Sequence, residues 1–200
     1  MNSQYLQTFQ TLEVRWFIDG DIPSEISEWF QHRCPGEPVS SYEQRTDYYF
    51  CLPGGNGVNL KLRQGNLELK WHQKHLGIRQ FGEIFGTGSN RVIWQGNLER
   101  WLKWSHREIP GFSDTTQFHC IPVQKTRSQR VYHNVYCELT QLQVQDERHW
   151  TFAFEMSVDQ TTSETDFEKA INWIAKTNPN LSLSSYQSRS YAEWLNANFF

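Results

Sequence analysis

The sequence has little cysteine, and its cysteines are far apart along the chain. Cys34, Cys51, Cys120 and Cys137 are the 4 cysteines among 200 residues, and no two are spaced as C-x-x-C. A zinc site usually takes its ligands from closely spaced pairs, so this spacing indicates no zinc site. Cys51, Cys120 and Cys137 lie in strand-like runs, where cysteine commonly serves as a small buried residue. We therefore predict a packing role for these three thiols.

Long apolar runs are also absent. No segment approaches the roughly 20 consecutive apolar residues that cross a bilayer as a helix. The first residues, Met1-Asn2-Ser3-Gln4-Tyr5, lack the basic region followed by an apolar one that marks a secretory leader. We expect a cytoplasmic protein with no membrane partner.

An excess of positive charge is missing too. The chain has 19 Lys and Arg against 22 Asp and Glu, a formal net charge of −3, and a sequence pI of about 6.2. A general nucleic-acid binder would carry a basic domain, so we predict no general nucleic-acid binding. Any anion site must come from a local concentration of basic side chains. No pattern indicates the oligomeric state.

Aromatic residues are what the chain has in quantity. Hydrophobic residues make up only 38%, but 15% of residues are aromatic and 9 are Trp, which supply much apolar area per residue. This composition is typical of a globular protein. Because the length suits one domain and no repeat or linker is apparent, we expect a single domain over residues 1–200.

The order of predicted elements indicates an α+β protein dominated by strands. A strand over about 11–17 precedes a helix that begins near Pro23 and ends before Pro35, and it should bury Ile22, Ile26, Trp29 and Phe30. Strand-like stretches then follow from 47 to 158, with turns such as 53–57 and 87–90. Helices are predicted from Ser163 to about Lys176, with Phe167, Ala170, Ile171 and Ile174 on one face, and over 191–196. Many alternating strands in one domain favour a sheet that curls or closes.

One predicted hairpin carries basic residues on one face. Residues 58–72 alternate polar and apolar side chains around Gly65-Asn66. If those two residues form the turn, Lys61 lies opposite Lys70 and Arg63 opposite Glu68. Like charges that face each other on a sheet are destabilising, so this face is easier to explain if an anion binds there.

The same alternation recurs in other strands. Glu13 and Arg15 share one face, as do Glu99 and Lys103, Lys125 and Arg127, and Glu138 and Thr140. One interpretation is an antiparallel sheet with a dry side and a solvated side. The other is a closed sheet whose charged faces point inward. In a closed sheet the Lys and Arg side chains would suit a polyphosphate, and the carboxylates would suit Mg²⁺ or Mn²⁺.

Short motifs in sequential order resemble the CYTH family, or triphosphate tunnel metalloenzymes. That family has an N-terminal E-x-E-x-K strand, a D-x-Y-F strand, an L-R-I-R and L-x-x-K hairpin, a late E-x-E strand and a closing S-Y-x-E-L-L helix. The similar segments here are TLEVR at 11–15, RTDYYF at 45–50, LKLR at 60–63, LELK at 67–70, FAFE at 152–155 and SYAEWL at 190–195.

The resemblance implies an antiparallel, closed β-barrel of about eight strands with flanking helices. Its tunnel would bind a triphosphate or other phosphorylated compound, and with a divalent metal it would hydrolyse that compound. The implied phosphate-binding residues are Arg15, Lys61, Arg63, Lys70, Lys103, Lys125 and Arg127, and the implied ligands of Mg²⁺ or Mn²⁺ are Glu13, Glu155 and Glu138.

The chain departs from the family pattern mainly in its carboxylates. Thr11 takes the place of the first Glu of E-x-E-x-K, Arg15 that of its Lys, and Ala153 that of one late Glu. Fewer carboxylates hold a hard cation less well. The alternative function is therefore a non-catalytic module that binds an anion or polyphosphate, with a degenerate metal site.

Trp101 shares the face of Glu99 and Lys103, which is unusual for a large aromatic side chain. It could stack on a base or other ring of a ligand, or it could simply narrow or plug the tunnel. A third possibility keeps the fold but uses the exposed aromatic residues as a protein interface.

Overall fold

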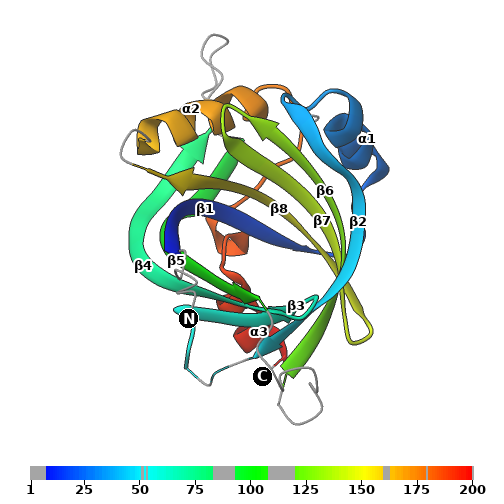
Figure 1. The fold of residues 1–200 in the computed structure, drawn as a ribbon. Helices are drawn as coiled ribbons and strands as arrows, with labels where there is room; N and C mark the ends of the chain where they lie inside the picture. Colours follow the sequence, from blue (N-terminus) through cyan, green and yellow to red (C-terminus); the bar gives the residue numbers. More distant parts are fainter. Residues whose placement is uncertain are drawn as a thin grey trace.

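Eight antiparallel strands close into a barrel in the computed structural model (Figure 1). Around the barrel the strand order is β1-β5-β4-β3-β2-β6-β7-β8. The structure describes residues 8–50, 52, 54–82, 93–107, 120–159, 163–178 and 180–199. The strands are β1 (Thr8–Asp19), β2 (Glu37–Phe50), β3 (Val58–Arg63), β4 (Asn66–Phe81), β5 (Trp94–Arg107), β6 (Cys120–Tyr132), β7 (Val135–Val144) and β8 (Glu147–Val158). The predicted α+β fold with a closed antiparallel barrel is confirmed.

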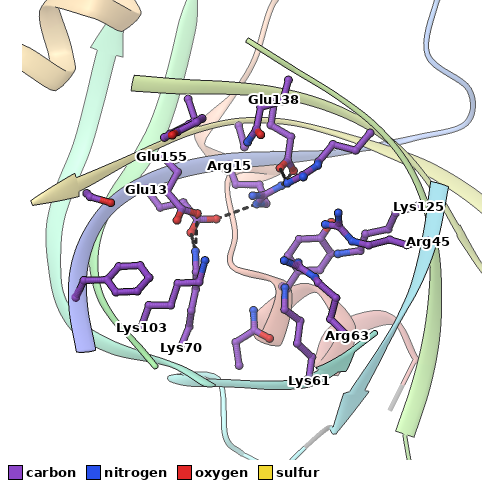
Figure 2. Close-up of a pocket in the computed structure, with 18 residues that line it drawn as sticks. Glu13, Arg15, Arg45, Lys61, Arg63, Lys70, Lys103, Lys125, Glu138 and Glu155 are labelled. Atoms are coloured by element: carbon purple, nitrogen blue, oxygen red, sulfur yellow. Dashed lines mark hydrogen bonds and ion pairs between the residues drawn. The ribbon is translucent and has the colours of Figure 1, made fainter. Parts of the chain in front are cut away.

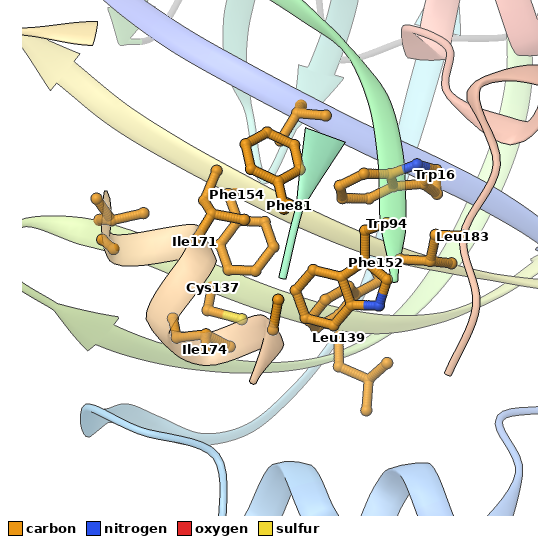
Figure 3. Close-up of a cluster of buried hydrophobic side chains, with 14 of the residues drawn as sticks. Trp16, Phe81, Trp94, Cys137, Leu139, Phe152, Phe154, Ile171, Ile174 and Leu183 are labelled. Atoms are coloured by element: carbon orange, nitrogen blue, oxygen red, sulfur yellow. The ribbon is translucent and has the colours of Figure 1, made fainter. Parts of the chain in front are cut away.

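The main apolar core lies outside the barrel wall, not within it. Successive strand residues point to opposite faces, so Leu12, Val14 and Trp16 of β1 face outward between residues that face the lumen. They pack with Phe152 and Phe154 of β8 in a cluster of buried aromatic rings (Figure 3). The outer face of these strands is dry, which leaves the inner face to the charged positions.

Two helices cover this outer core. The helix α1 (Ser24–His32) buries Ile26, Trp29 and Phe30 as predicted, while Ile22 lies before the helix and is half-buried. The helix α2 (Glu164–Ala175) begins at Ser163, whose side chain accepts a hydrogen bond from the Asp166 amide. It buries the predicted face formed by Phe167, Ala170, Ile171 and Ile174. Both helices are amphipathic elements that seal one side of the barrel (Figure 1).

The third helix packs against the lumen face at one end of the barrel. A short 3₁₀ helix, η2 (Ser185–Gln187), precedes α3 (Tyr191–Phe199), which confirms the predicted C-terminal helix. Ser190 and Glu193 exchange hydrogen bonds in a capping box at its start. Tyr191 and Trp194 of α3 pack on Phe17 of β1, Trp194 by stacking at 4.5 Å. This apolar cluster fills the end of the lumen next to α3.

The hairpin between β3 and β4 turns one residue earlier than the sequence predicts. The turn is Gln64-Gly65, with φ angles of 47° and 78°, and Lys61 lies opposite Glu68. The predicted pairings of Lys61 with Lys70 and of Arg63 with Glu68 are therefore wrong, since Arg63 lies opposite Asn66. A two-residue hairpin turn with positive φ at both positions favours glycine at the second, which Gly65 satisfies. The shift keeps every side chain on its predicted face and places opposite charges, Lys61 and Glu68, across the hairpin.

Lys70 instead lies opposite Asn59 on β3 and opposite Lys103 on β5. A pair of facing lysines therefore exists, but between β4 and β5.

Of the predicted buried thiols, Cys137 is buried, Cys120 is partly exposed, and Cys51 lies outside the described residues, as does the predicted turn at 87–90. Among the described helices, none is long and apolar enough to cross a membrane.

Candidate functional site

A cavity of about 280 Å³ lies inside the barrel (Figure 2). Every residue that the sequence predicts for phosphate or metal binding lines it, because the charged faces of the strands point inward and not toward solvent. These ten residues come from seven strands: Glu13, Arg15, Lys61, Arg63, Lys70, Lys103, Lys125, Arg127, Glu138 and Glu155. The structure shows that they share one cavity; their roles remain predictions.

One side of the cavity, here called the carboxylate wall, consists of Glu13, Glu155, Arg15 and Lys70. The Lys70 Nζ lies 2.6 Å from the Oε2 of Glu13 and 2.6 Å from the Oε2 of Glu155. Arg15 donates from Nε to the other oxygen of Glu13 at 2.9 Å. Burial raises the pKa of Glu13, but attraction to Lys70 and Arg15 outweighs burial and brings this pKa to about 2. Both carboxylates of this wall are therefore bound by basic side chains.

Glu138 continues this arrangement on β7. Arg15 donates from Nη1 to Glu138 at 2.9 Å, and Arg127 approaches its other oxygen at 3.4 Å. Burial raises the pKa of Glu138, yet the nearby guanidinium groups of Arg15 and Arg127 hold it well below its usual range. Arg15 thus connects two carboxylates, Glu13 and Glu138, and is held in a fixed position by both.

The opposite side, the basic wall, consists of Arg45, Lys61, Arg63 and Lys125 (Figure 2). These four side chains surround Asp47 of β2, whose side chain is fully buried. Arg63 binds both oxygens of Asp47 at 3.1 Å, Arg45 binds at 3.0 Å, and the Nζ atoms of Lys125 and Lys61 lie at 3.0 and 3.6 Å. One carboxylate therefore orients four basic groups that face the cavity.

Burial leaves the two lysines of the basic wall less basic than usual. Burial and repulsion from Arg63 lower the pKa of Lys61 well below its usual value, although Glu68 lies 3.2 Å away. Burial lowers the pKa of Lys125 to about 7, because attraction to Asp47 is opposed by Arg63 and Arg45. The Nζ of Lys125 also donates to the Tyr49 hydroxyl at 2.6 Å. An added negative charge in the cavity would favour the protonated form of both lysines.

Sequence reasoning missed three residues of this site. Arg45, Asp47 and Tyr49 are alternate residues of β2, so their side chains share the face that points into the lumen. The same alternation is visible in the motif at 45–50, from which Arg45 and Asp47 could have been predicted as lumen residues. Tyr191 lines the inner end of the cavity from α3, and its ring centroid lies 3.9 Å from the Lys125 Nζ and 5.0 Å from the Arg15 guanidinium. Tyr191 belongs to the family-like motif at 190–195, but the motif does not show that its side chain points into the lumen, so only the tertiary structure reveals this role.

Positive charge exceeds negative charge around the cavity. Eight basic side chains and three carboxylates line it. Lys103 makes no ion pair within the described residues, and its Nζ lies 5.5 Å from the centre of the Phe9 ring. Glu43, Asp47 and Glu68 pair with the basic groups without lining the cavity, so basic side chains still outnumber carboxylates by eight to six in a chain whose net charge is negative.

The predicted metal ligands do not form a metal site as they are arranged. Within the described part of the chain, no three His, Cys, Asp or Glu side chains converge as metal ligands would. Glu13 and Glu155 share the ammonium of Lys70, whereas Glu138 is held separately by Arg15 and Arg127. This set of carboxylates does not fit Mg²⁺ or Mn²⁺, which need oxygen donors that are free to coordinate.

Trp101 does not reach the cavity. Its side chain is only 3% exposed, its Nε1 donates to Glu99 at 3.1 Å, and its ring lies 5.0 Å from that of His72. Burial, together with repulsion from Glu193 and Glu13, raises the pKa of Glu99 to about 8. Trp101 therefore fills space beside the cavity, and the alternative in which it stacks on a ligand ring is not supported.

Comparison with known proteins supports the fold. No protein-family model matches the chain, and no curated protein matches it. A conserved hypothetical protein from Pyrococcus furiosus is similar in structure, with a TM-score of 0.50 and 13% identity over 92% of this chain and 98% of that one. The PH1012 protein from Pyrococcus horikoshii is similar as well, with a TM-score of 0.50 and 16% identity over 90% and 98% of the two chains. At these identities the likeness shows the fold alone.

Replacement of Asp47 by Asn should destabilise the protein strongly. The substitution leaves four buried basic groups without their shared carboxylate, which costs about 3 to 5 kcal/mol for a broken buried ion pair. Urea denaturation at neutral pH measures the change in the free energy of unfolding. Glu43→Gln is the control, because Glu43 also binds two arginines but is 28% exposed, and it should cost about 1 kcal/mol or less. Wild-type stability in Asp47→Asn would contradict this account of the basic wall.

Anion affinity should fall as the pH rises through neutrality. Because the pKa of Lys125 is about 7, the protonated form of its side chain exceeds the neutral form by about ten-fold at pH 6, and the ratio is reversed at pH 8. Sulfate is a suitable probe because its own charge is constant over this range. We expect several-fold weaker binding by calorimetry at the higher pH, and a flatter profile in Lys125→Met. The charged and titratable groups around Lys125 are Arg45, Asp47, Tyr49, Lys61, Arg63, Glu138 and Tyr191. An equal pH dependence in both proteins would show that another group is responsible.

Proposed function

We propose that the barrel lumen binds a triphosphate or another phosphorylated compound, and that the chain is a divergent relative of the CYTH family. One observation carries this proposal: eight basic side chains line one cavity, against three carboxylates that line it and three more, Glu43, Asp47 and Glu68, that bind the basic side chains without lining it. The sequential order of the family-like motifs supports it, since the residues quoted from those motifs supply most of the charged lining.

The basic wall suits phosphate oxygens in kind and position. A guanidinium binds two oxygens through parallel hydrogen bonds, whereas an ammonium acts as a point charge. Arg63 of the basic wall and Arg127, which shares Glu43 with Arg45 of that wall, each keep 20% of the side chain exposed. Both can therefore contact a ligand while they remain bound to Asp47 and Glu138. The wall therefore offers oriented donors to an anion before it arrives, which lowers the entropy cost of binding.

The size of the cavity favours a compact anionic group. At about 280 Å³ it is near the small end of ligand pockets, which run from roughly 300 to 1,000 Å³. Phe9 and Tyr136 also line it, and these aromatic side chains are 38% and 39% exposed. We propose that the phosphates occupy the basic wall and that a flat ring of the ligand contacts Phe9 or Tyr136.

Binding is better supported than metal-dependent hydrolysis. Hydrolysis of the kind implied by the family would need Glu13, Glu155 or Glu138 to hold Mg²⁺ or Mn²⁺ beside the phosphates. In this chain basic side chains bind all three carboxylates. The function we propose is therefore anion binding. Release of phosphate from the bound compound would show that the protein is instead an enzyme.

Tripolyphosphate should bind the wild-type protein in the presence of EDTA. Isothermal titration calorimetry at low salt should show one site. Arg127→Ala should lower the affinity for tripolyphosphate about ten-fold or more, because it removes one charge-assisted contact. Arg148→Ala is the matched control, because Arg148 is 58% exposed and does not line this cavity.

Two results would contradict the proposal. No binding of tripolyphosphate at low salt would remove the anion site altogether. Equal losses in Arg127→Ala and Arg148→Ala would show that binding is non-specific attraction to surface charge.

Phosphate release from triphosphate, ATP or thiamine triphosphate with Mg²⁺ or Mn²⁺ would favour the enzymatic alternative.

Removal of the aromatic side chains should separate ring-containing ligands from inorganic ones. In the double variant Phe9→Ala/Tyr136→Ala, ATP should bind about ten-fold more weakly, since stacking of a base on an aromatic ring contributes roughly 1 to 3 kcal/mol. The affinity for tripolyphosphate should change little. Trp71→Ala is the control, because Trp71 is an exposed aromatic residue outside the cavity. A similar loss for both ligands would contradict a ring contact at these residues.

A further inference from the structure

Glu13 and Glu155 form a pair of carboxylates that needs a cation. They lie directly opposite each other on β1 and β8 and point into the same cavity (Figure 2). Two like charges in this position repel each other, and neither side chain is exposed enough for water to screen them fully. Some positive group must lie between them for both to be ionised.

Lys70 supplies that positive group from a strand that is not adjacent to either. It lies on β4, and β5 separates it from β1. Its side chain extends along the lumen and places Nζ 2.6 Å from one oxygen of each carboxylate. Both contacts join an ammonium to a carboxylate, and the two carboxylates favour the charged form of Lys70. The ammonium is therefore charged at any physiological pH.

The remaining oxygen of Glu13 is occupied as well. Arg15 donates to it at 2.9 Å, so Lys70 and Arg15 together neutralise the two carboxylates. A divalent cation that entered this cluster would add two positive charges beside two basic groups. It could coordinate the carboxylates only after displacement of Lys70, whose ammonium would then lie unpaired beside Lys103.

We propose that the ammonium of Lys70 is a built-in replacement for a divalent cation between Glu13 and Glu155. The carboxylate wall is complete without metal, and the lumen takes its anion without a metal cofactor. This consequence for the ligand rests on the proposed anion-binding function, whereas the replacement of metal by Lys70 concerns the protein alone.

Manganese binding tests this replacement without any anion present. Mn²⁺ is titrated into the purified protein and followed by electron paramagnetic resonance and calorimetry. The wild-type protein should show no stoichiometric site. Lys70→Met should bind one Mn²⁺ at least about ten-fold more tightly, because two carboxylates are released as ligands. Addition of Glu155→Gln to Lys70→Met should abolish this site.

Lys103→Met is the matched control. It removes the same charge from the facing position on β5, but Lys103 is paired with no carboxylate in the described structure. It should gain no Mn²⁺ site. An equal gain in Lys103→Met and Lys70→Met would overturn the proposal, because loss of positive charge alone would then explain the binding.

The wild-type measurement is decisive even if a variant does not fold. Stoichiometric Mn²⁺ binding by the wild-type protein that is lost in Glu155→Gln would overturn the replacement, and so would a folded Lys70→Met that gains no site. If Lys70→Met does not fold, Lys70→Gln takes its place with the same expected gain. Failure of tripolyphosphate binding, by contrast, would remove the proposed function and leave the Mn²⁺ result unchanged.

Discussion

A buried carboxylate or ammonium is stable only when an opposite charge lies beside it, and the lumen of this barrel is arranged around that requirement. Closure of the sheet directs the charged strand positions inward, where water cannot satisfy them. Each acidic side chain that lines the cavity consequently contacts at least one basic one. The apolar residues of the same strands point outward and form the core under α1 and α2.

The two walls of the cavity meet this requirement in different ways. On the carboxylate wall, Lys70 and Arg15 balance Glu13 and Glu155, which leaves no net charge. On the basic wall, four basic groups share Asp47, and Glu43 and Glu68 pair with three of the four, so four basic groups meet three carboxylates. The proposed phosphate site rests on this wall because its Lys and Arg groups line the cavity, whereas the carboxylates that pair with them do not. The same ion pairs that stabilise the buried charges also fix the hydrogen-bond donors of the cavity in place.

The side-chain parity of the strands made much of this site predictable. Alternation along the sequence assigned Arg15, Lys61, Lys125 and Glu138 to one face, and the structure places all of them in one cavity. Helix boundaries followed from capping residues such as Ser163, and from the apolar stripe of α2. These are local properties, so a single sequence contains them.

Pairings across the barrel could not be predicted in the same way. Contact between Lys70 of β4 and Glu155 of β8 depends on closure through β1 and β5, and Tyr191 enters the lumen only because α3 packs against its end. The hairpin register was mispredicted because both Gln64-Gly65 and Gly65-Asn66 are acceptable turns, and the choice depends on charges such as Lys61 and Glu68 that meet only in the folded sheet. Asp47 was overlooked because its importance lies in four partners drawn from three strands.

The proposed function and the proposed role of Lys70 together require that an anion binds the basic wall while Lys70 stays between Glu13 and Glu155. Crystals grown with tripolyphosphate and Mn²⁺ test it directly, because Mn²⁺ is located by its anomalous scattering. We expect phosphate density against Arg63 and Arg127, Lys70 still bound to both carboxylates, and no anomalous peak between them. An anomalous peak between Glu13 and Glu155, with Lys70 displaced, would contradict it.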